Sequence, residues 1–554
     1  MLYGDWGTSK AYVLGIAFAL SGHASWFFLG LMSALTAMVG VCYVVICRIY
    51  PDGGGVYSSV KHRSQTLAVI GALLLVADYV VTASLSALDA FHYFNFSHPE
   101  LWAIAAIFTI GVINWVGPTK GGSIAAVIGL AASIVAGILF LSTLSSLPHM
   151  ELKWPHGSLT TNWSNFVGIV LALSGVEAIA NMTGIMVEPV EKTSKKAILP
   201  VLFEVTILTF LLGIAMNSIP GLTNHTEDML RVLGSHFIGP WYGQLISIIF
   251  GFLLLSAVNT ALTDLVNIQF LMAKDRELPS VFTWLNQFGM PGLALVIATT
   301  VPALVLLIEH DLVGLASFYA IGVVGAITLN LGSCATNSKI QLKKWERGLL
   351  FAGTGILFFI ELTICFQKHN ALLFASTVLG IGLVLRYAAK QVVPVPISEE
   401  VAAVNVLTVS EAKEIAALYK SSSMVALKSL NLHLLEEAAL RMKARGEHSI
   451  YLAYVEESPP GRDFLTEVEP SPRSLELLGH AQKEMEARGI TAVPIWRIGE
   501  NAGKLIADAA RELGVNTVMI GTTKRSALVS LLRGDVLRTL ARNLPAECHL
   551  VISG

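Results

Sequence analysis

The sequence predicts an α-helical membrane protein of about twelve transmembrane helices, built as an inverted five-plus-five repeat and followed by a cytosolic, doubly wound α/β domain. Three observations predict it: a very apolar composition, long apolar runs at regular intervals, and two interrupted runs at corresponding places. Of the 554 residues, 54% are hydrophobic and 14% are charged, and the mean hydropathy is +0.65. Soluble domains are less apolar than this. The net charge of -2 gives no sign of a nucleic-acid partner.

Apolar runs long enough to cross a bilayer, which takes about 20 residues, recur through the first two thirds of the chain. We expect spans over residues 3–22, 25–48, 66–89, 101–116, 122–146, 164–186, 196–219, 239–265, 292–308, 312–334, 347–366 and 371–390. The sequence therefore predicts a multi-pass protein of the cell membrane.

The basic residues between these spans predict the orientation of the bundle. With a cytoplasmic N-terminus, the inner loops and helix ends carry Arg48, Lys61, Arg63, Lys120, Lys192, Lys195, Lys196, Lys274, Arg276, Lys339, Lys343, Lys344, Arg347, Arg386 and Lys390. The outer side carries only Lys153, Arg231 and Lys368. Because Lys and Arg concentrate in cytoplasmic loops, this bias places both termini in the cytoplasm.

The last part of the chain has the composition of a soluble domain. We expect a transmembrane domain over residues 1–391, a linker over 392–421 that contains Pro394 and Pro396, and an α/β domain over 422–554. Strand-like runs are Met424–Leu427, Ser449–Val455, Thr491–Trp496, Thr517–Ile520 and Cys548–Ile552, and helical patterns are Leu435–Lys443, Ser474–Ala487, Ala502–Glu512 and Asp535–Asn543. Strands that alternate with helices predict a parallel, doubly wound sheet.

Spans one and six share an interruption. The first contains Gly4-Asp5-Trp6-Gly7-Thr8-Ser9 and the sixth contains Ala172-Leu173-Ser174-Gly175-Val176-Glu177-Ala178. Each joins glycine, a hydroxyl residue and a carboxylate, and the two lie five spans apart. Interrupted helices at matching positions mark an inverted repeat with a substrate site at the breaks. Unwound backbone and helix ends there suit a small cation or a zwitterion, and Asp5 supplies charge.

Carboxylates inside a bilayer are functional candidates, since each costs about 2.5–3.5 kcal/mol on insertion scales. Asp78 shares one helix face with Thr82 and Ser86, which predicts a polar stripe facing the cavity or, alternatively, hydrogen bonds between helices. Glu177 could hold a cation, carry a proton or cap a half-helix. Glu204, Asp264 and Glu361 have no break or partner nearby, so we expect them to be structural.

At these residues the chain resembles known families. "YGDWGTSKAY" resembles the Gly-Asp-(Ile/Val)-Gly-Thr-Ser-Pro-Leu-Tyr motif of the Kup/HAK/KT potassium uptake family. "YPDGGGVY", "DYVVTASLS", "ALSGVEAIAN" and "FYAIGVVGAITLN" extend the similarity over residues 1–391 to KimA-type transporters, which are potassium importers of the amino acid-polyamine-organocation superfamily. The resemblance implies a LeuT-like inverted repeat with broken helices 1 and 6, potassium entry coupled to protons, and a homodimer.

The same resemblance implies a set of site residues. Carried over by position, the residues that line the cation site are Asp5, Tyr12, Thr82, Ser86, Ser174, Glu177 and Tyr319. Ser174 stands where the family usually has Thr and keeps the hydroxyl, and Glu177 is the candidate proton or cation carrier. By residue reasoning alone, Tyr12 and Tyr319 would be interfacial anchors. Potassium at this site is substrate, and scattered cysteines predict no structural metal.

Two departures from the motif keep alternatives open. Lys10 replaces an apolar residue, and a buried ammonium facing Asp5 could fill a cation site with a tethered charge. Lys10 and Asp78 therefore join Glu177 as candidates for coupling or specificity, and the alternative function is a proton-coupled permease for a small amino acid. The chain also begins almost at the motif, so we expect an upstream N-terminus or an incomplete first helix.

The C-terminal domain resembles the universal stress protein fold. Gly521 and Gly534 keep the spacing of that family's Gly-x2-Gly-x9-Gly-Ser nucleotide loop, whereas Lys524 replaces the middle glycine and Asp535 the serine. Lys428 stands where an adenine-contacting Asp is usual. We therefore expect a regulatory or dimerising role more than nucleotide binding.

The sequence as a whole favours a secondary transporter without a cofactor. It has no catalytic triad, metal cluster or ATP-hydrolysis motif, so we expect neither an enzyme nor a primary pump. A sensor whose soluble domain binds a nucleotide, and whose membrane part transports little, is a further alternative. The expected partners are potassium or a small amino acid, protons, lipid and a second copy of the chain.

Overall fold

The computed structural model describes residues 6–51, 53, 55–117, 121–144, 151–173, 175–181, 183, 186, 189–219, 222, 225–391, 406–409, 411–412, 421–458, 470–522 and 535–553. The chain divides into two compact units, one over residues 1–284 and 291–390 and the other over residues 285–290 and 391–554.

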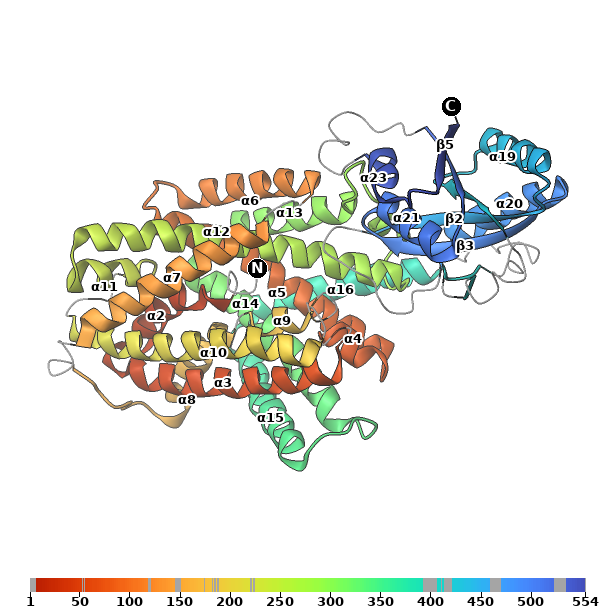
Figure 1. Ribbon diagram of the computed structural model, residues 1–554. Coiled ribbons are helices and arrows are strands. Elements are labelled where there is room, and N and C mark those ends of the chain that lie inside the picture. The colour runs from red at the N-terminus through yellow and green to blue at the C-terminus, as the bar shows by residue number, and fades with distance from the viewer. Residues whose placement is uncertain are drawn as a thin grey trace. The chain divides into compact units, whose positions relative to one another are not determined.

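The first unit is a bundle of apolar helices (Figure 1). Its elements are α2 Ser9–Ser21, η1 Gly22–Ala24, α3 Ser25–Ile49, α4 Val56–Lys61, α5 Gln65–Tyr93, α6 Pro99–Val116, α7 Gly121–Thr143, α8 Leu159–Gly168, η3 Val170–Leu173, α9 Val176–Asn181, α10 Val190–Ala215, η5 Met216–Ser218, α11 Met229–Phe237, α12 Pro240–Lys274, η7 Ser280–Thr283, α13 Gly292–Ile308, α14 Leu312–Thr336, α15 Lys344–Gln367 and α16 His369–Gln391. Val112, Leu130 and Phe366 are 68%, 64% and 76% exposed. Helices that are apolar on their outer face as well as their inner face belong in lipid.

Nine helices within the described residues are long and apolar enough to cross a membrane. Three local features separate this number from the twelve expected spans. The stretch Ser9–Ile49 counts as one candidate although the chain turns at Gly22, where φ is 52°. Residues 164–186 are broken into short pieces, and Gly292–Ile308 has only 17 residues. The finding is a multi-pass helical bundle.

The helices pair in a regular order. Helix α3 packs on α10, α5 packs on α12, and α6 packs on α13. In the numbering of the expected spans, these pairs join span two to span seven, span three to span eight, and span four to span nine. The two members of each pair are therefore five spans apart. Side chains at these contacts belong to one continuous apolar core, which includes Leu29, Leu202 and Phe250.

Helix α14 lies against α5 with the two backbones almost touching. A Cβ on Gly322 would lie 2.8 Å from the Asp78 backbone nitrogen, and one on Gly325 would lie 3.0 Å from Cδ1 of Leu74. Later residues of α14 therefore contact earlier residues of α5, so the two helices are antiparallel. Tyr319 on α14 therefore lies at the level of Thr82 on α5.

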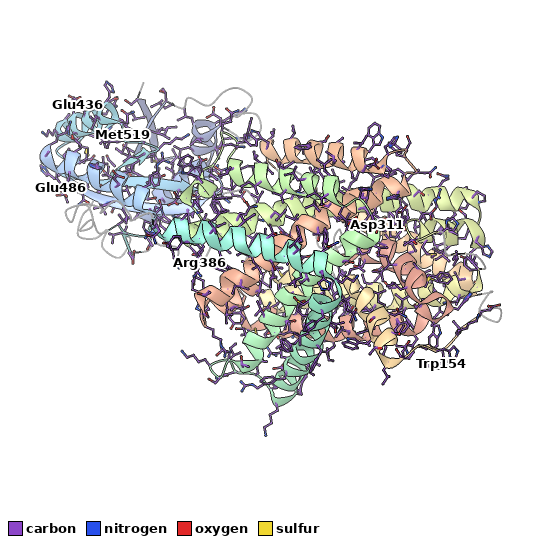
Figure 2. The ribbon with its side chains drawn as sticks, turned by 180° about the vertical axis from the view of Figure 1, so that it is seen from behind. Trp154, Asp311, Arg386, Glu436, Glu486 and Met519 are labelled. Carbon is purple, nitrogen blue, oxygen red and sulfur yellow. The ribbon has the colours of Figure 1, made fainter. Side chains whose placement is uncertain are left out.

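Ion pairs join helix ends at the basic side of the bundle. Arg386 of α16, which is labelled in Figure 2, pairs with Glu277, which also binds Lys390 at 3.1 Å. Lys61 Nζ and the Tyr57 hydroxyl each lie 2.7 Å from Oδ2 of Asp275. Burial and this nearby carboxylate raise the pKa of Tyr57 above its usual range, so its hydroxyl stays a donor.

The second unit is a five-stranded parallel sheet with strand order β3-β2-β1-β4-β5. Its strands are β1 Ser423–Leu427, β2 Ser449–Glu457, β3 Thr491–Gly499, β4 Thr517–Gly521 and β5 His549–Ser553, and its helices are α19 Leu432–Arg445, α20 Pro472–Ala487, α21 Ala502–Leu513 and α23 Val536–Asn543. Chain order runs outward from β1 in both directions, which is a doubly wound sheet. The predicted parallel α/β sheet is confirmed.

Alternation along β1 builds two cores in this unit. Met424 and Ala426 lie in one core with residues of α21 and α23. Val425 and Leu427 lie in the other with residues of α19 and α20. Successive side chains of a strand point to opposite faces, so β1 is apolar throughout because helices cover both faces.

We predict that Gly322→Ala destabilises the bundle and that Gly355→Ala does not. The new methyl group at position 322 would meet the α5 backbone, which cannot move as a flexible side chain can, at a cost of about 1–3 kcal/mol. Gly355 on α15 has nothing within 4 Å of a Cβ, so alanine there favours the helix. Thermal unfolding in detergent measures both, and equal melting temperatures for the two variants would contradict the packing of α5 on α14.

Candidate functional site

The two interrupted segments meet in the bundle. Gly175 lies between η3 and α9 with φ of 85°, a conformation that glycine adopts readily. A Cβ there would lie 2.6 Å from the backbone nitrogen of Trp6 and 2.7 Å from its Cα. Trp6 itself is fully buried, just before α2. The segments that the sequence singled out as breaks are thus in backbone contact.

Several predicted site residues cannot be placed. Asp5, Ser174 and Gly534 lie outside the described residues. Their roles remain predictions from the sequence. Asp5 directly precedes Trp6 and Ser174 directly precedes Gly175, so both flank the contact between the two segments along the chain.

Glu177 is buried at the start of α9. It is 3% exposed, and its Oε1 accepts a hydrogen bond from the backbone N–H of Gly175 at 3.3 Å. A carboxylate in the first turn satisfies an otherwise unpaired amide and interacts favourably with the helix dipole. The capping role considered for Glu177 is therefore present. It also fixes the carboxylate beside the contact between the two interrupted segments.

Helices α5 and α14 place a polar stripe beside these segments. Asp78 is fully buried, and Thr82 Oγ1 lies 3.0 Å from the Asp78 carbonyl oxygen and 3.4 Å from Oδ1 of its carboxylate. Ser86 is also buried, one turn further along α5. Tyr319 is 2% exposed at the level of Thr82. The three polar side chains of α5 are therefore buried together, and Thr82 forms its hydrogen bonds within this helix.

Packing links the stripe to the interrupted segments. Helix α2, which carries the buried Tyr12, packs on η3, and α14 packs on η3 as well. The hydroxyl of Tyr93 on α5 donates to the carbonyl oxygen of Ala11 on α2 at 2.9 Å. The described members of the predicted set, namely Tyr12, Thr82, Ser86, Glu177 and Tyr319, therefore lie on elements that adjoin one another.

Lys10 and Glu204 form a buried ion pair. Lys10 Nζ lies 2.5 Å from Oε1 of Glu204 on α10, and the Lys10 side chain is fully buried. The expectation that Glu204 has no partner is wrong. The reason is tertiary, because the two residues are 194 positions apart and only the packing of α10 on α2 joins them. Lys10 therefore directs its charge toward α10.

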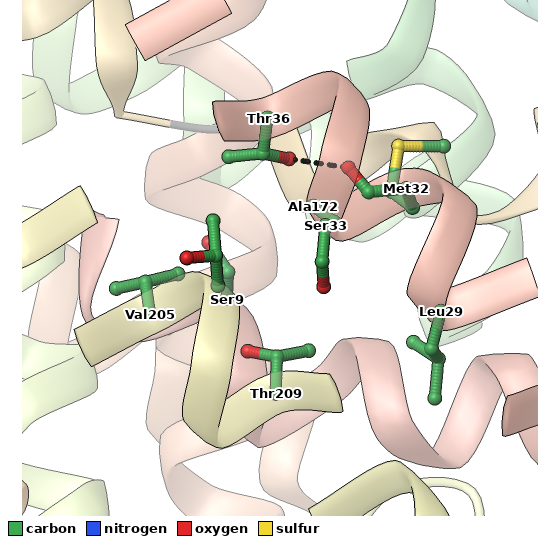
Figure 3. Close-up of a pocket in the computed structure, with 9 residues that line it drawn as sticks. Ser9, Leu29, Met32, Ser33, Thr36, Ala172, Val205 and Thr209 are labelled. Atoms are coloured by element: carbon green, nitrogen blue, oxygen red, sulfur yellow. Dashed lines mark hydrogen bonds between the residues drawn. The ribbon is translucent and has the colours of Figure 1, made fainter. Parts of the chain in front are cut away.

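A pocket lies beside this ion pair, between α2, α3, η3 and α10 (Figure 3). Its lining is Ser9, Leu29, Met32, Ser33, Thr36, Ala172, Val205, Thr206 and Thr209. Ser9, Thr36 and Thr206 donate their hydroxyl hydrogens to the backbone carbonyls of Trp6, Met32 and Leu202. Their oxygen lone pairs thus remain available to accept or coordinate. Five hydroxyl groups make the pocket polar without adding charge.

Sequence reasoning also missed a polar network on α3 and α14. Tyr43 on α3 is buried within electrostatic reach of Glu177 and bonds to the side chain of Asn330 on α14. Ser59 donates to Oδ1 of Asn330 at 2.7 Å. A lone tyrosine or asparagine in an apolar run carries no pattern, so no sequence signal could have identified them.

The chemistry of the region is that of oxygen ligands. Carboxylates, hydroxyls and the backbone of interrupted helices surround it, and such groups suit hard cations. No cluster of His, Cys, Asp and Glu with the geometry of a metal site occurs in the described part of the chain. Lys10 adds one fixed positive charge next to these groups.

In the second unit, the residues of the predicted nucleotide loop are only partly placed. Gly521 ends β4, and Asn431, which caps α19, lies beside it. Asp535 caps α23, with its Oδ1 2.9 Å from the backbone nitrogen of Leu537. The carboxylate satisfies backbone amides at that helix N-terminus, which are groups of the kind that bind phosphates.

Comparison with known proteins gives two family matches. Residues 3–382 match the model of the amino acid permease family, and residues 402–551 match the universal stress protein family. The potassium transporter KimA of Bacillus subtilis (strain 168) is 25% identical over 431 residues, covering 70% of this chain and 69% of that protein. The structure of a universal stress protein from Archaeoglobus fulgidus covers 24% of this chain and 97% of its own, with 20% identity and a TM-score of 0.19.

We predict that removing either partner of the Lys10–Glu204 pair destabilises the bundle, and that Glu204→Gln has the larger effect. Glu204→Gln removes the carboxylate that neutralises a fully buried ammonium, whereas Lys10→Met removes the ammonium beside a carboxylate whose side chain is 18% exposed. Breaking a buried pair costs about 3–5 kcal/mol. The double variant Lys10→Met/Glu204→Met should recover most of the loss, because neither position then carries a charge.

Thermal unfolding of the purified variants in detergent measures this order. Lys195→Met, which removes one partner of the exposed Glu191–Lys195 pair, serves as the matched control and should change little. A double variant no more stable than Glu204→Gln would rule out the ion pair as the source of the loss.

Proposed function

We propose that the chain, which belongs to the amino acid permease family, is a secondary active transporter. In this proposal it imports potassium, and the import is coupled to protons. The chain is a multi-pass membrane protein with a C-terminal α/β unit of the universal stress protein family. The observation that carries the proposal is the backbone contact between Trp6 and Gly175, with the Glu177 carboxylate fixed beside it.

The proposed architecture is a LeuT-like repeat of twelve spans with helices 1 and 6 broken. The pairing of α3 with α10, α5 with α12, and α6 with α13 supports it, because a five-span repeat would relate the two members of each pair. Two half-helices then meet end to end in the middle of the bundle. Such ends offer free carbonyls and dipoles to an ion at mid-membrane depth.

In the proposed site, oxygen atoms from four elements replace the water around potassium. Glu177 and Asp5 supply negative charge, and Tyr12, Thr82, Ser86, Ser174 and Tyr319 supply hydroxyls. The negative charge helps to compensate for the loss of hydration of a buried cation. We propose that Glu177 also exchanges a proton, since its carboxylate can be either a charged ligand or a neutral cap.

The resemblance in sequence to a potassium transporter favours this substrate. The relative named as a potassium transporter shares 25% identity and matches along most of this chain. Its named substrate is the reason that potassium stands first among the candidates.

A proton-coupled permease for a small amino acid is the second candidate. The observation that favours it is the buried ammonium of Lys10, which directly follows the interrupted segment at the start of α2. A tethered cation there could take the place of a coupling ion and leave the oxygen ligands to a zwitterion. The family as a whole is described as amino acid permeases.

We further propose a topology and an assembly. The excess of Lys and Arg at one side of the bundle favours cytoplasmic termini and a cytosolic α/β unit. A regulatory or dimerising role suits this unit, and the chain would act as a homodimer. Nucleotide binding at Gly521 and Gly534 is less favoured, because Asp535 caps α23 with a negative charge.

We predict that the chain supports rubidium uptake at low external potassium in cells that lack their own potassium importers. Glu177→Gln and Asp5→Asn should each reduce uptake by about tenfold or more, because a buried cation loses a charged ligand. Glu151→Gln, which changes a carboxylate whose side chain is 70% exposed, should leave uptake unchanged.

The alternatives predict different outcomes. If the unchanged chain reaches the membrane and takes up no rubidium but takes up labelled amino acids, the permease proposal replaces the potassium proposal. If it takes up neither, while the purified chain binds ATP, the protein is a sensor. Uptake that survives in Glu177→Gln would remove Glu177 from the site.

A further inference from the structure

Asp89 is a buried carboxylate that the proposed substrate site does not use. It lies near the end of α5, is fully buried, and neither of its carboxylate oxygens has a hydrogen-bond partner among the described residues. An ionised carboxylate in such a place has lost its hydration and gained nothing in exchange. Asp89 therefore needs a ligand that removes its charge.

The charges that face Asp89 are acidic. Glu227 and Asp228, in the segment before α11, both act on it electrostatically. The nearby basic groups are already engaged elsewhere: Nδ1 of His92 lies 2.7 Å from Glu227, and Nδ1 of His225 lies 3.1 Å from Asp228, which Arg231 also binds. Negative neighbours favour the neutral form of a carboxyl group.

Among the described residues, the other elements packed on α5 add no basic partner for Asp89, since Lys61 of α4 pairs with Asp275. Helices α13 and α14 carry no Asp, Glu, Lys, Arg or His, α12 carries only Asp264 and Lys274 in its second half, and α6 carries Glu100 beside His98. On α2 the only charged residue is Lys10, which pairs with Glu204. The phenol of Tyr93 donates to Ala11. The described residues therefore supply no counter-charge for Asp89, which leaves solution as its source.

We propose that Asp89 is a proton-binding site, separate from the site at the interrupted helices, and that its proton is exchanged during coupled transport in addition to the one at Glu177. In the described part of the chain, no group of His, Cys, Asp and Glu residues that could hold a metal ion surrounds Asp89. A hard cation needs several oxygen ligands. A proton needs one. The proposal rests on the proposed function, because it names a second coupling group of that transporter.

The same acids lie in a segment that is seated on α2. A Cβ on Gly15 of α2 would lie 1.9 Å from the carbonyl oxygen of Thr226, so the backbone of this segment touches the helix directly. Glu227 and Asp228 follow immediately. A charge on Asp89 repels these two carboxylates, and a proton on Asp89 removes the repulsion. Protonation of Asp89 thus stabilises the segment in its place against the helix that carries Tyr12.

Infrared difference spectroscopy of the full chain in lipid vesicles, between acidic and alkaline buffer, tests the site directly. We expect a band of a protonated carboxyl group that is absent in Asp89→Asn and present in Glu100→Gln, which removes a partly exposed acid near the start of α6. The same carboxyl bands in Asp89→Asn and the unchanged chain would overturn the proposal.

A second variant covers the case in which Asp89→Asn does not fold. Asp89→Glu keeps an acid in the same place, so its carboxyl band should shift in frequency and remain sensitive to pH. An unshifted band would show that Asp89 is not the protonated group and would overturn the proposal.

Transport separates this inference from the proposed function. We expect Asp89→Asn vesicles to bind rubidium as the unchanged chain does, with the stimulation of uptake by a proton gradient lost. Stimulation that persists in Asp89→Asn would overturn the coupling role. Failure of the unchanged chain to take up rubidium would instead contradict the proposed function, and the infrared result would still decide whether Asp89 holds a proton.

Discussion

No side chain can stand at position 175, because a Cβ there would lie 2.6 Å from the backbone nitrogen of Trp6. This constraint brings two interrupted segments, from opposite halves of the membrane unit, into backbone contact. The position of Glu177 follows from it, since the carboxylate caps the helix that begins directly after Gly175. So does the packing of η3 against both α2 and α14, through which Tyr12 and Tyr319 reach the same region.

The bundle buries several charged side chains, and each of them is stabilised in a different way. Lys10 and Glu204 neutralise each other across α2 and α10. Glu177 accepts a backbone amide, and Asp78 is bonded to Thr82. Asp89 has no such partner among the described residues, which is why we assign it a proton. A transporter that couples a cation to protons needs groups of both kinds, some fixed and some that change charge.

Much of this could be predicted from the sequence, and the limits have physical causes. Apolar runs marked the long helices, alternation marked the α/β sheet, and glycine beside carboxylate marked both breaks. Glu204 could not be paired with Lys10, because no local pattern reports a contact between residues 194 positions apart. Asp89 was missed because the expected span ended at that residue, whereas α5 continues to Tyr93 and buries it. Asp5 and Ser174 remain sequence predictions.

Direct binding of labelled rubidium to the purified full chain tests the central claim that the two interrupted helices form a cation site. We expect binding that potassium displaces and amino acids do not, and that Glu177→Gln abolishes while Glu151→Gln preserves it. Binding that is unaffected by Glu177→Gln, or that is displaced by amino acids, would contradict the claim.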